Sequence, residues 1–261
     1  MKIKYDHKKM IKLYESGMST REVADQMNCG KSTVSAAMKK AGVSRPRRIR
    51  QHILEKRVNV CKEFSEEFRK YLDGLLISDG HLKVPSTHVK TSSYRQTSLS
   101  KEWLESIQKR FEEYGISSVI RPEKRHPINL VLRTKHYDKL YVERLRWYPK
   151  KKKLVPEDLD LGDASLLKNW IYGDGTLCGP TTFRFCTDSF SFKEMEKLKM
   201  KFFELGHSFK YVSMGKTKQV QEKRRLAICK RDGLFEFFEA VGKPDIQYFG
   251  YKWPVKKKGD I

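Results

Sequence analysis

Apolar residues recur at two spacings along residues 64–148, and these spacings predict an alternation of helices and strands. Apolar side chains every three or four positions predict helices, at residues 64–78, 100–114 and 137–148. Shorter segments in which apolar and polar positions roughly alternate predict strands, at residues 81–90, 93–99, 116–123 and 128–134. Ser100 is the expected N-cap of the middle helix, and Gly115 its expected end.

Residues 167–242 repeat this order. An apolar helical segment is followed by a predicted strand at residues 181–187. Ser191 and Glu194 have the spacing of a capping box, which predicts the start of the next helix. The remaining predicted elements are a hairpin of residues 207–214 and 224–229 and a final helix that starts at Asp232.

Two short segments in equivalent positions share their ending. Residues 72–80 read Leu-Asp-Gly-Leu-Leu-Ile-Ser-Asp-Gly and residues 167–175 read Leu-Lys-Asn-Trp-Ile-Tyr-Gly-Asp-Gly. A glycine after an apolar helical run is typical of a helix end in the left-handed conformation. If the two helices pack side by side, the small residues Gly74, Ser78 and Gly173 let the backbones approach closely. Asp79 and Asp174 then lie together at the ends of the helix pair.

The N-terminal segment, residues 5–42, predicts three short helices. Ser19 and Glu22 have capping-box spacing, and a turn at residues 28–30 precedes a helix in which Val34 and Met38 would face a core. This layout is typical of a helix-turn-helix, and the stretch is similar to the DNA-binding domains of resolvases and transposases. The residues expected to face a major groove are Lys31, Ser32, Thr33, Ser35 and Lys39. A purely structural three-helix cap is the alternative.

A basic segment follows this module. It contains Arg45, Arg47 and Arg48 beside a proline, and it could lie along a phosphate backbone or enter a minor groove. A solvated run of charge is an equally good interpretation.

Composition strengthens the case for a polyanionic partner. The 261 residues include 55 Lys and Arg against 32 Asp and Glu, a formal net charge of +23. No apolar run approaches the length of a membrane span, so we expect no membrane association. The five cysteines are scattered, which argues against a zinc site or a disulfide framework and favours a reducing, intracellular, cytoplasmic setting.

The paired aspartates suggest a metal site. Two carboxylates a few ångström apart do not both ionise readily unless a cation lies between them. Mg²⁺ prefers oxygen ligands, keeps several waters and needs only one or two carboxylates. We therefore interpret Asp79 and Asp174 as ligands of a shared metal site, the alternative being two solvated aspartates at helix ends.

Two such motifs about a hundred residues apart resemble the LAGLIDADG homing endonucleases in their single-chain form. The first segment matches the family pattern, whereas the second has Asn169 in place of the inner glycine. The resemblance implies an α+β fold, a duplicated αββαββα saddle with two four-stranded antiparallel sheets, beside the small all-α helix-turn-helix domain. It also implies a monomer that cuts double-stranded DNA at a long asymmetric site, using Mg²⁺ or Mn²⁺, and leaves staggered ends.

The resemblance further places a lysine near each active centre. Lys252 and Lys153 precede prolines and are the expected counterparts, although any of residues 150–153 could serve. A polar side chain near the end of the second strand often orders waters in the family, and the candidates are Gln96 or Thr97 and Thr187 or Asp188. The side chains expected to read or clamp DNA from the sheets are Lys83, Lys90, Arg95, Gln96, Arg121, Arg133, Thr182, Arg184, Lys210 and Arg225.

These observations give a domain plan and two competing functions. The plan assigns a helix-turn-helix domain to residues 1–44, a basic linker to 45–63, and the repeats to 64–153 and 154–261. A non-catalytic DNA-binding transcriptional regulator is one alternative, although such proteins usually lose the motif aspartates. An intron RNA maturase is the other, because basic sheets could also grip RNA. For an endonuclease, an origin in an intron, a free-standing mobile element or a phage fits best.

Overall fold

A computed structural model describes residues 5–43, 59–85, 90–149, 151–213 and 224–255. The chain forms two compact units, a small one within residues 1–58 and a larger one from residue 59 onward. Each unit has its own cluster of buried apolar side chains. Arg45, Arg47 and Arg48 lie outside the described residues. Residues 59–63, at the end of the predicted linker, belong to the larger unit, where Lys62 N donates to the Tyr114 carbonyl oxygen at 3.0 Å.

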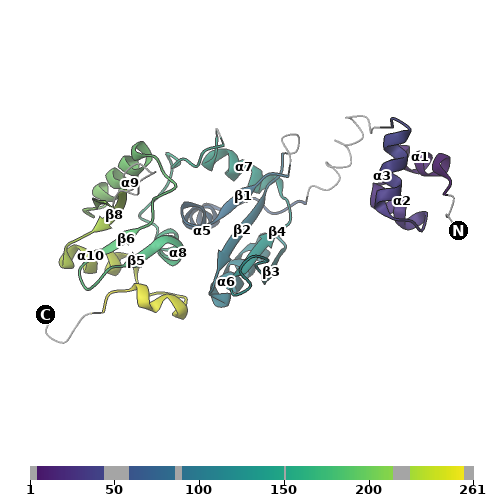
Figure 1. The fold of residues 1–261 in the computed structure, drawn as a ribbon. Coiled ribbons are helices and arrows are strands. Elements are labelled where there is room, and N and C mark those ends of the chain that lie inside the picture. The colour runs from purple at the N-terminus through teal and green to yellow at the C-terminus, as the bar shows by residue number, and fades with distance from the viewer. Residues whose placement is uncertain (1–4, 44–58, 86–89, 150, 214–223, 256–261) are drawn as a thin grey trace. The chain divides into compact units, whose positions relative to one another are not determined.

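The small unit contains the helices α1 (His7–Glu15), α2 (Thr20–Gln26) and α3 (Lys31–Lys40) (Figure 1). Ser19 accepts from Glu22 N and the Glu22 carboxylate accepts from Ser19 N, so the predicted capping box is present. Val34 and Met38 are buried against residues from α1 and α2, as expected. The face of α3 opposite Val34 and Met38 therefore remains exposed.

The larger unit repeats one arrangement twice. Its helices are α5 (Glu66–Ile77), α6 (Lys101–Glu113), α7 (Asp138–Trp147), α8 (Ala164–Asp174), α9 (Phe192–Glu204), α10 (Arg231–Val241) and the 3₁₀ helix η1 (Gln247–Lys252). Its strands are β1 (His81–Lys83), β2 (Ser93–Ser98), β3 (Ser118–Pro122), β4 (Leu130–Thr134), β5 (Gly175–Leu177), β6 (Phe183–Phe185), β7 (Lys210–Ser213) and β8 (Arg224–Ile228).

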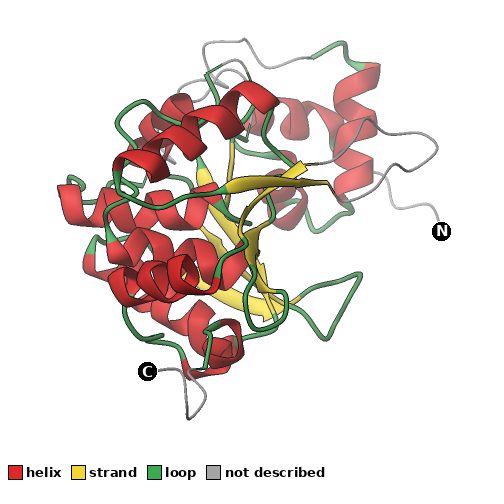
Figure 2. Ribbon diagram, turned by 90° about the vertical axis from the view of Figure 1, so that its left-hand side faces the viewer, coloured by secondary structure: helices red, strands yellow, loops and turns green. Residues whose placement is uncertain are grey.

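The strands form two four-stranded antiparallel sheets of the same topology. Their orders are β1-β2-β4-β3 and β5-β6-β8-β7. The helices of the larger unit lie against one side of the strands, which leaves the other side of each sheet uncovered by helices (Figure 2). The predicted duplicated αββαββα fold is confirmed.

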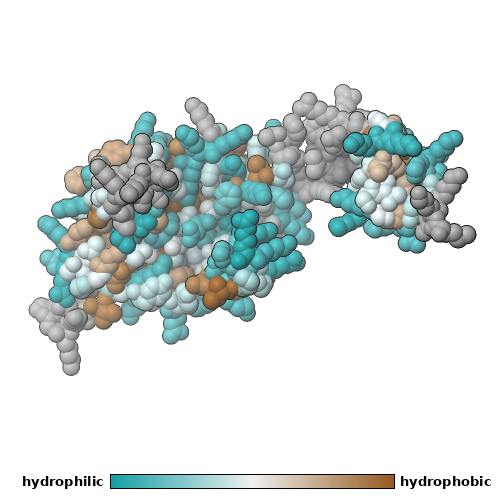
Figure 3. Space-filling model, in the orientation of Figure 1, coloured by the Kyte–Doolittle hydropathy of each residue, from teal (hydrophilic) through white to brown (hydrophobic). Residues whose placement is uncertain are grey.

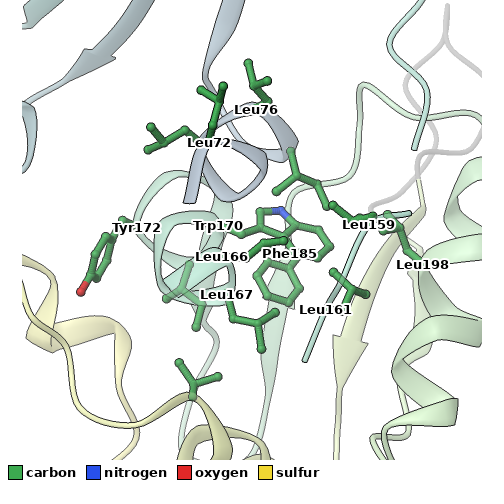
Figure 4. Close-up of a cluster of buried hydrophobic side chains, with 14 of the residues drawn as sticks. Leu72, Leu76, Leu159, Leu161, Leu166, Leu167, Trp170, Tyr172, Phe185 and Leu198 are labelled. Atoms are coloured by element: carbon green, nitrogen blue, oxygen red, sulfur yellow. The ribbon is translucent and has the colours of Figure 1, made fainter. Parts of the chain in front are cut away.

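The two motif helices, α5 and α8, cross in the middle of this unit. A Cβ added to Gly74 would lie 2.4 Å from the Leu166 carbonyl oxygen, and one added to Gly173 would lie 2.6 Å from the Ser78 Cβ. The backbones therefore touch at this crossing, as the small residues predicted. Around it, Trp170 stacks on Phe185 with ring centroids 3.9 Å apart, within a cluster of leucines from both helices (Figure 4).

Several local predictions differ from the structure. The strand expected at residues 81–90 ends at Lys83 in the described residues, and the strand β5, which starts at the motif glycine, was not predicted. Helix α10 starts at Arg231, one residue before the predicted Asp232. Ser191 caps α9, but Glu194 does not complete a capping box. Its buried carboxylate accepts from Val155 N at 2.5 Å instead and so ties α9 to the connection between the repeats.

Candidate active site

The motif segments end their helices without a left-handed glycine. Ser78 is the C-cap of α5, and α8 ends at Asp174, followed by Gly175 in an extended conformation (φ −73°, ψ 141°). Neither Gly80 nor Gly175 is among the described glycines with positive φ. The expectation that these glycines end the helices through the left-handed conformation is therefore wrong.

Close backbone contact explains both glycines. A Cβ on Gly80 would lie 2.2 Å from the Leu75 carbonyl oxygen, and one on Gly175 would lie 2.7 Å from the Ile171 carbonyl oxygen. Only a residue without a side chain lets the chain pass this close to the end of its own helix. The chain thus turns directly from helix into strand, and the preceding aspartate stands at the turn.

The structure brings the two aspartates together. The position that a Gly173 Cβ would take is 3.5 Å from Asp79 N, so the two turns are in contact. Asp79 is exposed and Asp174 is half-buried. Burial and, next, the negative charge of Asp79 together raise the pKa of the Asp174 carboxyl to about 7, against the opposing charges of Lys153, Lys252 and Arg225.

A lysine covers the end of each motif helix. Lys153 Nζ donates to the carbonyl oxygens of Ile77 at 3.0 Å and Ser78 at 2.8 Å. Lys252 Nζ donates to those of Ile171 at 3.0 Å and Tyr172 at 2.7 Å. A cation at a helix C-terminus satisfies carbonyls that have no partner within the helix and offsets the negative end of the helix dipole.

The two lysines share their electrostatic setting with both aspartates. Burial lowers the pKa of Lys153 and of Lys252 to about 8, and in each case the charges of Asp174 and Asp79 oppose that shift. Each lysine therefore senses the carboxylates of both repeats. Of the candidates in residues 150–153, Lys151 and Lys152 are exposed to solvent and Lys150 lies outside the described residues, so Lys153 is the one placed at the site.

The donor set fits Mg²⁺. Within the described residues, no group of three or more His, Cys, Asp or Glu side chains could enclose a metal ion. Two carboxylates that leave the other positions to water and phosphate suit Mg²⁺, which dehydrates reluctantly. The raised pKa of Asp174 is consistent with this fit, because such a carboxyl is short of positive charge in the metal-free protein.

Two of the predicted water-ordering residues point into the core. Gln96 is fully buried beside Tyr94, and its Oε1 accepts from the Tyr94 hydroxyl at 2.6 Å. Gln96 therefore cannot read DNA as predicted, because strand alternation places it on the helix-covered face. Thr187 is also fully buried, and its hydroxyl contacts the Met195 sulfur at 3.3 Å. Thr97, half-buried on the opposite face of β2 from Gln96, keeps its candidacy.

The first sheet carries a basic groove on the face away from its helices. A cavity of about 550 Å³ lies there, and its lining includes Arg95, Arg121, Lys124, Arg125 and Arg133. The surface around β2 and β3 is largely hydrophilic (Figure 3). Arg95 pairs with Glu123 at 2.6 Å, which orients its guanidinium along the groove. The other two predicted DNA-contacting residues of this repeat, Lys83 and Lys90, are exposed.

The second sheet and the helix-turn-helix present their candidates in a similar way. Lys210 is exposed, whereas Thr182 and Arg184 are half-buried. Arg225 forms a two-point ion pair with Asp188, with Nε–Oδ1 3.0 Å and Nη2–Oδ2 2.8 Å. The two side chains are therefore already paired in the DNA-free protein. On α3, the exposed candidates are Lys31, Ser32, Ser35 and Lys39, and Thr33 is half-buried.

A buried ionic cluster that positions Lys153 was missed from sequence. Arg146 donates to both oxygens of Asp73, at 2.5 and 2.9 Å, and Trp147 Nε1 donates to Asp73 Oδ1 at 2.8 Å. This cluster fixes α7 on α5, and Leu154 N then donates to the Trp147 carbonyl oxygen at 2.9 Å. A carboxylate inside an apolar helix was the available signal, because a buried acid requires a cationic partner.

Comparisons with known proteins agree with this fold. The model of the LAGLIDADG DNA endonuclease family matches residues 69–233, and that of the helix-turn-helix domain of resolvase matches residues 2–34. The chain is 30% identical to the uncharacterized protein MJ1098 of Methanocaldococcus jannaschii over 229 residues, which cover 78% of this chain and 84% of that protein.

A solved homing endonuclease structure shows the same architecture. The homing endonuclease I-WcaI bound to its DNA recognition sequence superposes with a TM-score of 0.60 at 17% identity, covering 82% of this chain and 96% of that one. I-DmoI in complex with DNA and Mn superposes with a TM-score of 0.45 at 17% identity, covering 66% and 94%. With its two crossed motif helices, its paired sheets and the family match over most of its length, this chain belongs to the LAGLIDADG DNA endonuclease family and carries a resolvase-type helix-turn-helix domain at its N-terminus.

Proposed function

We propose that the protein is a site-specific homing endonuclease that hydrolyses both strands of duplex DNA with divalent metal and leaves staggered ends. The observation that carries the proposal is the meeting of Asp79 and Asp174 at the ends of two helices in backbone contact. Acids whose pKa is raised by burial and by a neighbouring carboxylate are concentrated at catalytic sites, and this favours an enzyme over a DNA-binding protein that does not cut.

Mg²⁺, with Mn²⁺ able to replace it, would be held by Asp79 and Asp174 and would supply a metal-bound water and charge neutralisation. Hydrolysis forms a bond from a water oxygen to phosphorus and breaks the bond from phosphorus to one ester oxygen. The water gives up a proton to solvent, and the departing oxygen takes one up. Negative charge grows on the phosphate oxygens during this exchange.

The lysines act on that growing charge. At neutral pH both ammonium groups are largely protonated, because their pKa of about 8 lies above it. Their hydrogen bonds to helix-end carbonyls hold both ammonium groups in place. Each ammonium group has three N–H bonds, and Lys252 directs its third, longer contact to the Gly173 carbonyl oxygen at 3.5 Å. Lys153 thus keeps an N–H bond beyond its two carbonyl partners. Fixed cations of this kind lower the barrier to phosphoryl transfer.

The sheets would bind the DNA. Their faces away from the helices carry the arginine groove of the first repeat and the candidates Lys210, Arg184 and Arg225 of the second. The fold of I-WcaI, whose structure contains its DNA recognition sequence, supports this orientation. Because the two repeats differ, one chain acting as a monomer would read an asymmetric site, and the helix-turn-helix would lengthen it. Binding should weaken steeply with salt.

A plasmid carrying the native locus tests the proposal. Incubation with protein and Mg²⁺ should convert supercoiled plasmid to linear DNA with staggered ends, and EDTA should prevent it. A matched plasmid with the locus scrambled should stay intact. DNA that shifts in a gel but stays uncut with Mg²⁺ or Mn²⁺ would contradict the proposal and favour a transcriptional regulator.

A further inference from the structure

Among the described strands, the register places an arginine in the row of Asp174 and a valine at the equivalent position in the row of Asp79. In the second repeat Gly175 pairs with Phe185, and Phe185 pairs with Leu226. The next row across the sheet is therefore Asp174, Cys186 and Arg225, and Cys186 N donates to the Asp174 carbonyl oxygen at 2.9 Å. Two strand spacings separate Asp174 from Arg225, so their Cα atoms are about 10 Å apart.

Arg225 points to the face away from the helices. Its neighbour Leu226 is fully buried with Phe185, and strand alternation turns Arg225 to the opposite side. Its guanidinium uses Nε and Nη2 for Asp188. No described residue accepts from Nη1, which is therefore available to a phosphate. An arginine held by a carboxylate on one edge keeps a fixed orientation for a second, planar contact on the other.

The first repeat has no arginine at the equivalent position of the sheet; its carboxylate-held arginine, Arg95, lies two residues along β2 from this row, opposite Arg133. The equivalent row there is Asp79, Thr97, Val131 and Arg121, because Thr97 pairs with Val131 and Val131 with Arg121. Valine thus occupies the position of Arg225. The arginine of this row is one strand farther out, about 14 Å from Asp79 between Cα atoms. The positive charge of Arg225 lowers the pKa of Asp174, against the effects of burial and of Asp79.

We propose that Arg225, oriented by Asp188, binds a non-bridging oxygen of the scissile phosphate nearest Asp174, so that this strand is cut faster than the other. This inference rests on the proposed endonuclease function and deepens it. Arg225 would touch the substrate, and Asp188 is a positioning residue that acts through Arg225. Because the first repeat lacks an equivalent contact, removing Arg225 should affect the two strands unequally.

The test is strand-resolved cleavage under single-turnover conditions. A duplex containing the cleavage site mapped on the plasmid carries a different fluorophore at each 5′ end, and protein is in saturating excess with Mg²⁺. Arg225→Ala should slow the faster strand about 100-fold, the usual loss for one fixed transition-state donor, and the other strand less than threefold. Asp188→Asn should slow the same strand about tenfold, and Arg225→Lys should restore part of the rate.

Lys193→Ala is the control, since it removes an exposed cation from helix α9 of the same repeat, and it should change neither strand more than threefold. Equal slowing of both strands by Arg225→Ala, or no slowing, would overturn the inference while leaving the proposed function intact. Absence of metal-dependent cutting by the wild-type protein would instead reject the proposed function. If Arg225→Ala lowers the melting temperature, Arg225→Lys replaces it in the comparison of the two strands. A cleavage rate equal to wild type on both strands for Asp188→Asn would also overturn the inference.

Discussion

The two repeats share a backbone frame but fill it with different chemistry. Gly74 and Asn169 occupy matched positions of the motif helices, because each is the third residue of its segment. Gly74 touches the Leu166 backbone, whereas the Asn169 side chain accepts from Trp103 Nε1 at 3.2 Å. Contact between the backbones therefore requires a glycine on one helix only. The equivalent position on the other helix is available for a side chain that fixes α6.

The comparison separates the features of the proposed site that occur in both repeats from those that differ between them. Each repeat keeps an aspartate at the helix end, a glycine at the turn and a lysine over the helix carbonyls. The surroundings vary: Asp73 of the first segment pairs with Arg146, and Lys168 at the same position in the second pairs with Asp245 at 2.8 Å. The geometry of the proposed site is thus the same in both repeats, while the contacts that support it differ.

The largest effect on stability is expected from Gly74→Ala. The new Cβ would meet the Leu166 backbone at 2.4 Å, which cannot be relieved by a side-chain movement. We expect a loss of about 3 kcal/mol or more in the free energy of unfolding, measured by urea titration. Asn169→Ala, at the matched position of the other repeat, should cost only about 1 kcal/mol, because it removes one hydrogen bond.

A second pair of variants checks that the helix crossing is the cause. Gly173→Ala should destabilise the protein because its Cβ would lie 2.6 Å from that of Ser78. Combining it with Ser78→Gly removes the clashing atoms and should recover most of the loss. Equal stability of Gly173→Ala and the double variant would show that the helices do not touch as described.

Replacing the capping lysines should reduce cleavage more than binding. Lys153→Met and Lys252→Met each remove a cation from the site, and we expect single-turnover cleavage to slow about 100-fold. Melting temperatures should also fall, since helix-end carbonyls lose their donor. Lys152→Met, an exposed neighbour, is the control and should leave the cleavage rate unchanged. A binding defect with a normal rate at saturation would reject a role in the chemistry.

The pH dependence of stability should report the raised pKa of Asp174. The pKa of Asp174 is raised to about 7 in the folded, metal-free protein from an ordinary value near 3.8. The folded state therefore binds the proton more tightly, and stability from this group is lost as pH rises toward 7. Between pH 5 and 7.5 in EDTA, wild type should lose roughly 1–2 kcal/mol relative to Asp174→Asn. Parallel pH profiles for the two proteins would contradict this.

Sequence periodicity and the motif were sufficient for the fold. Helix-period and strand-period segments located most elements, and the repeated aspartates located the site. Side-chain direction was harder, as Gln96 shows, because residues on one strand alternate between core and solvent and the phase depends on the register with β4. The role of Gly80 depends on its close approach to the carbonyl of Leu75, and a glycine in the sequence does not by itself predict that contact.

Contacts between distant segments were beyond sequence reasoning. The pairing of Asp73 with Arg146, and of Asp188 with Arg225, joins residues far apart along the chain. Neither pair follows from local spacing. The short strand β5 was missed because it begins at the motif glycine, a residue that strands disfavour.

Strand-resolved cleavage by Asp79→Asn and Asp174→Asn tests most directly whether the two carboxylates serve one shared site. On the doubly labelled duplex with Mg²⁺, either substitution should slow the cutting of both strands by about 1,000-fold or more, while the dissociation constant for DNA stays within about threefold of wild type. A variant that still cuts one strand at the wild-type rate would show that the aspartates serve separate sites.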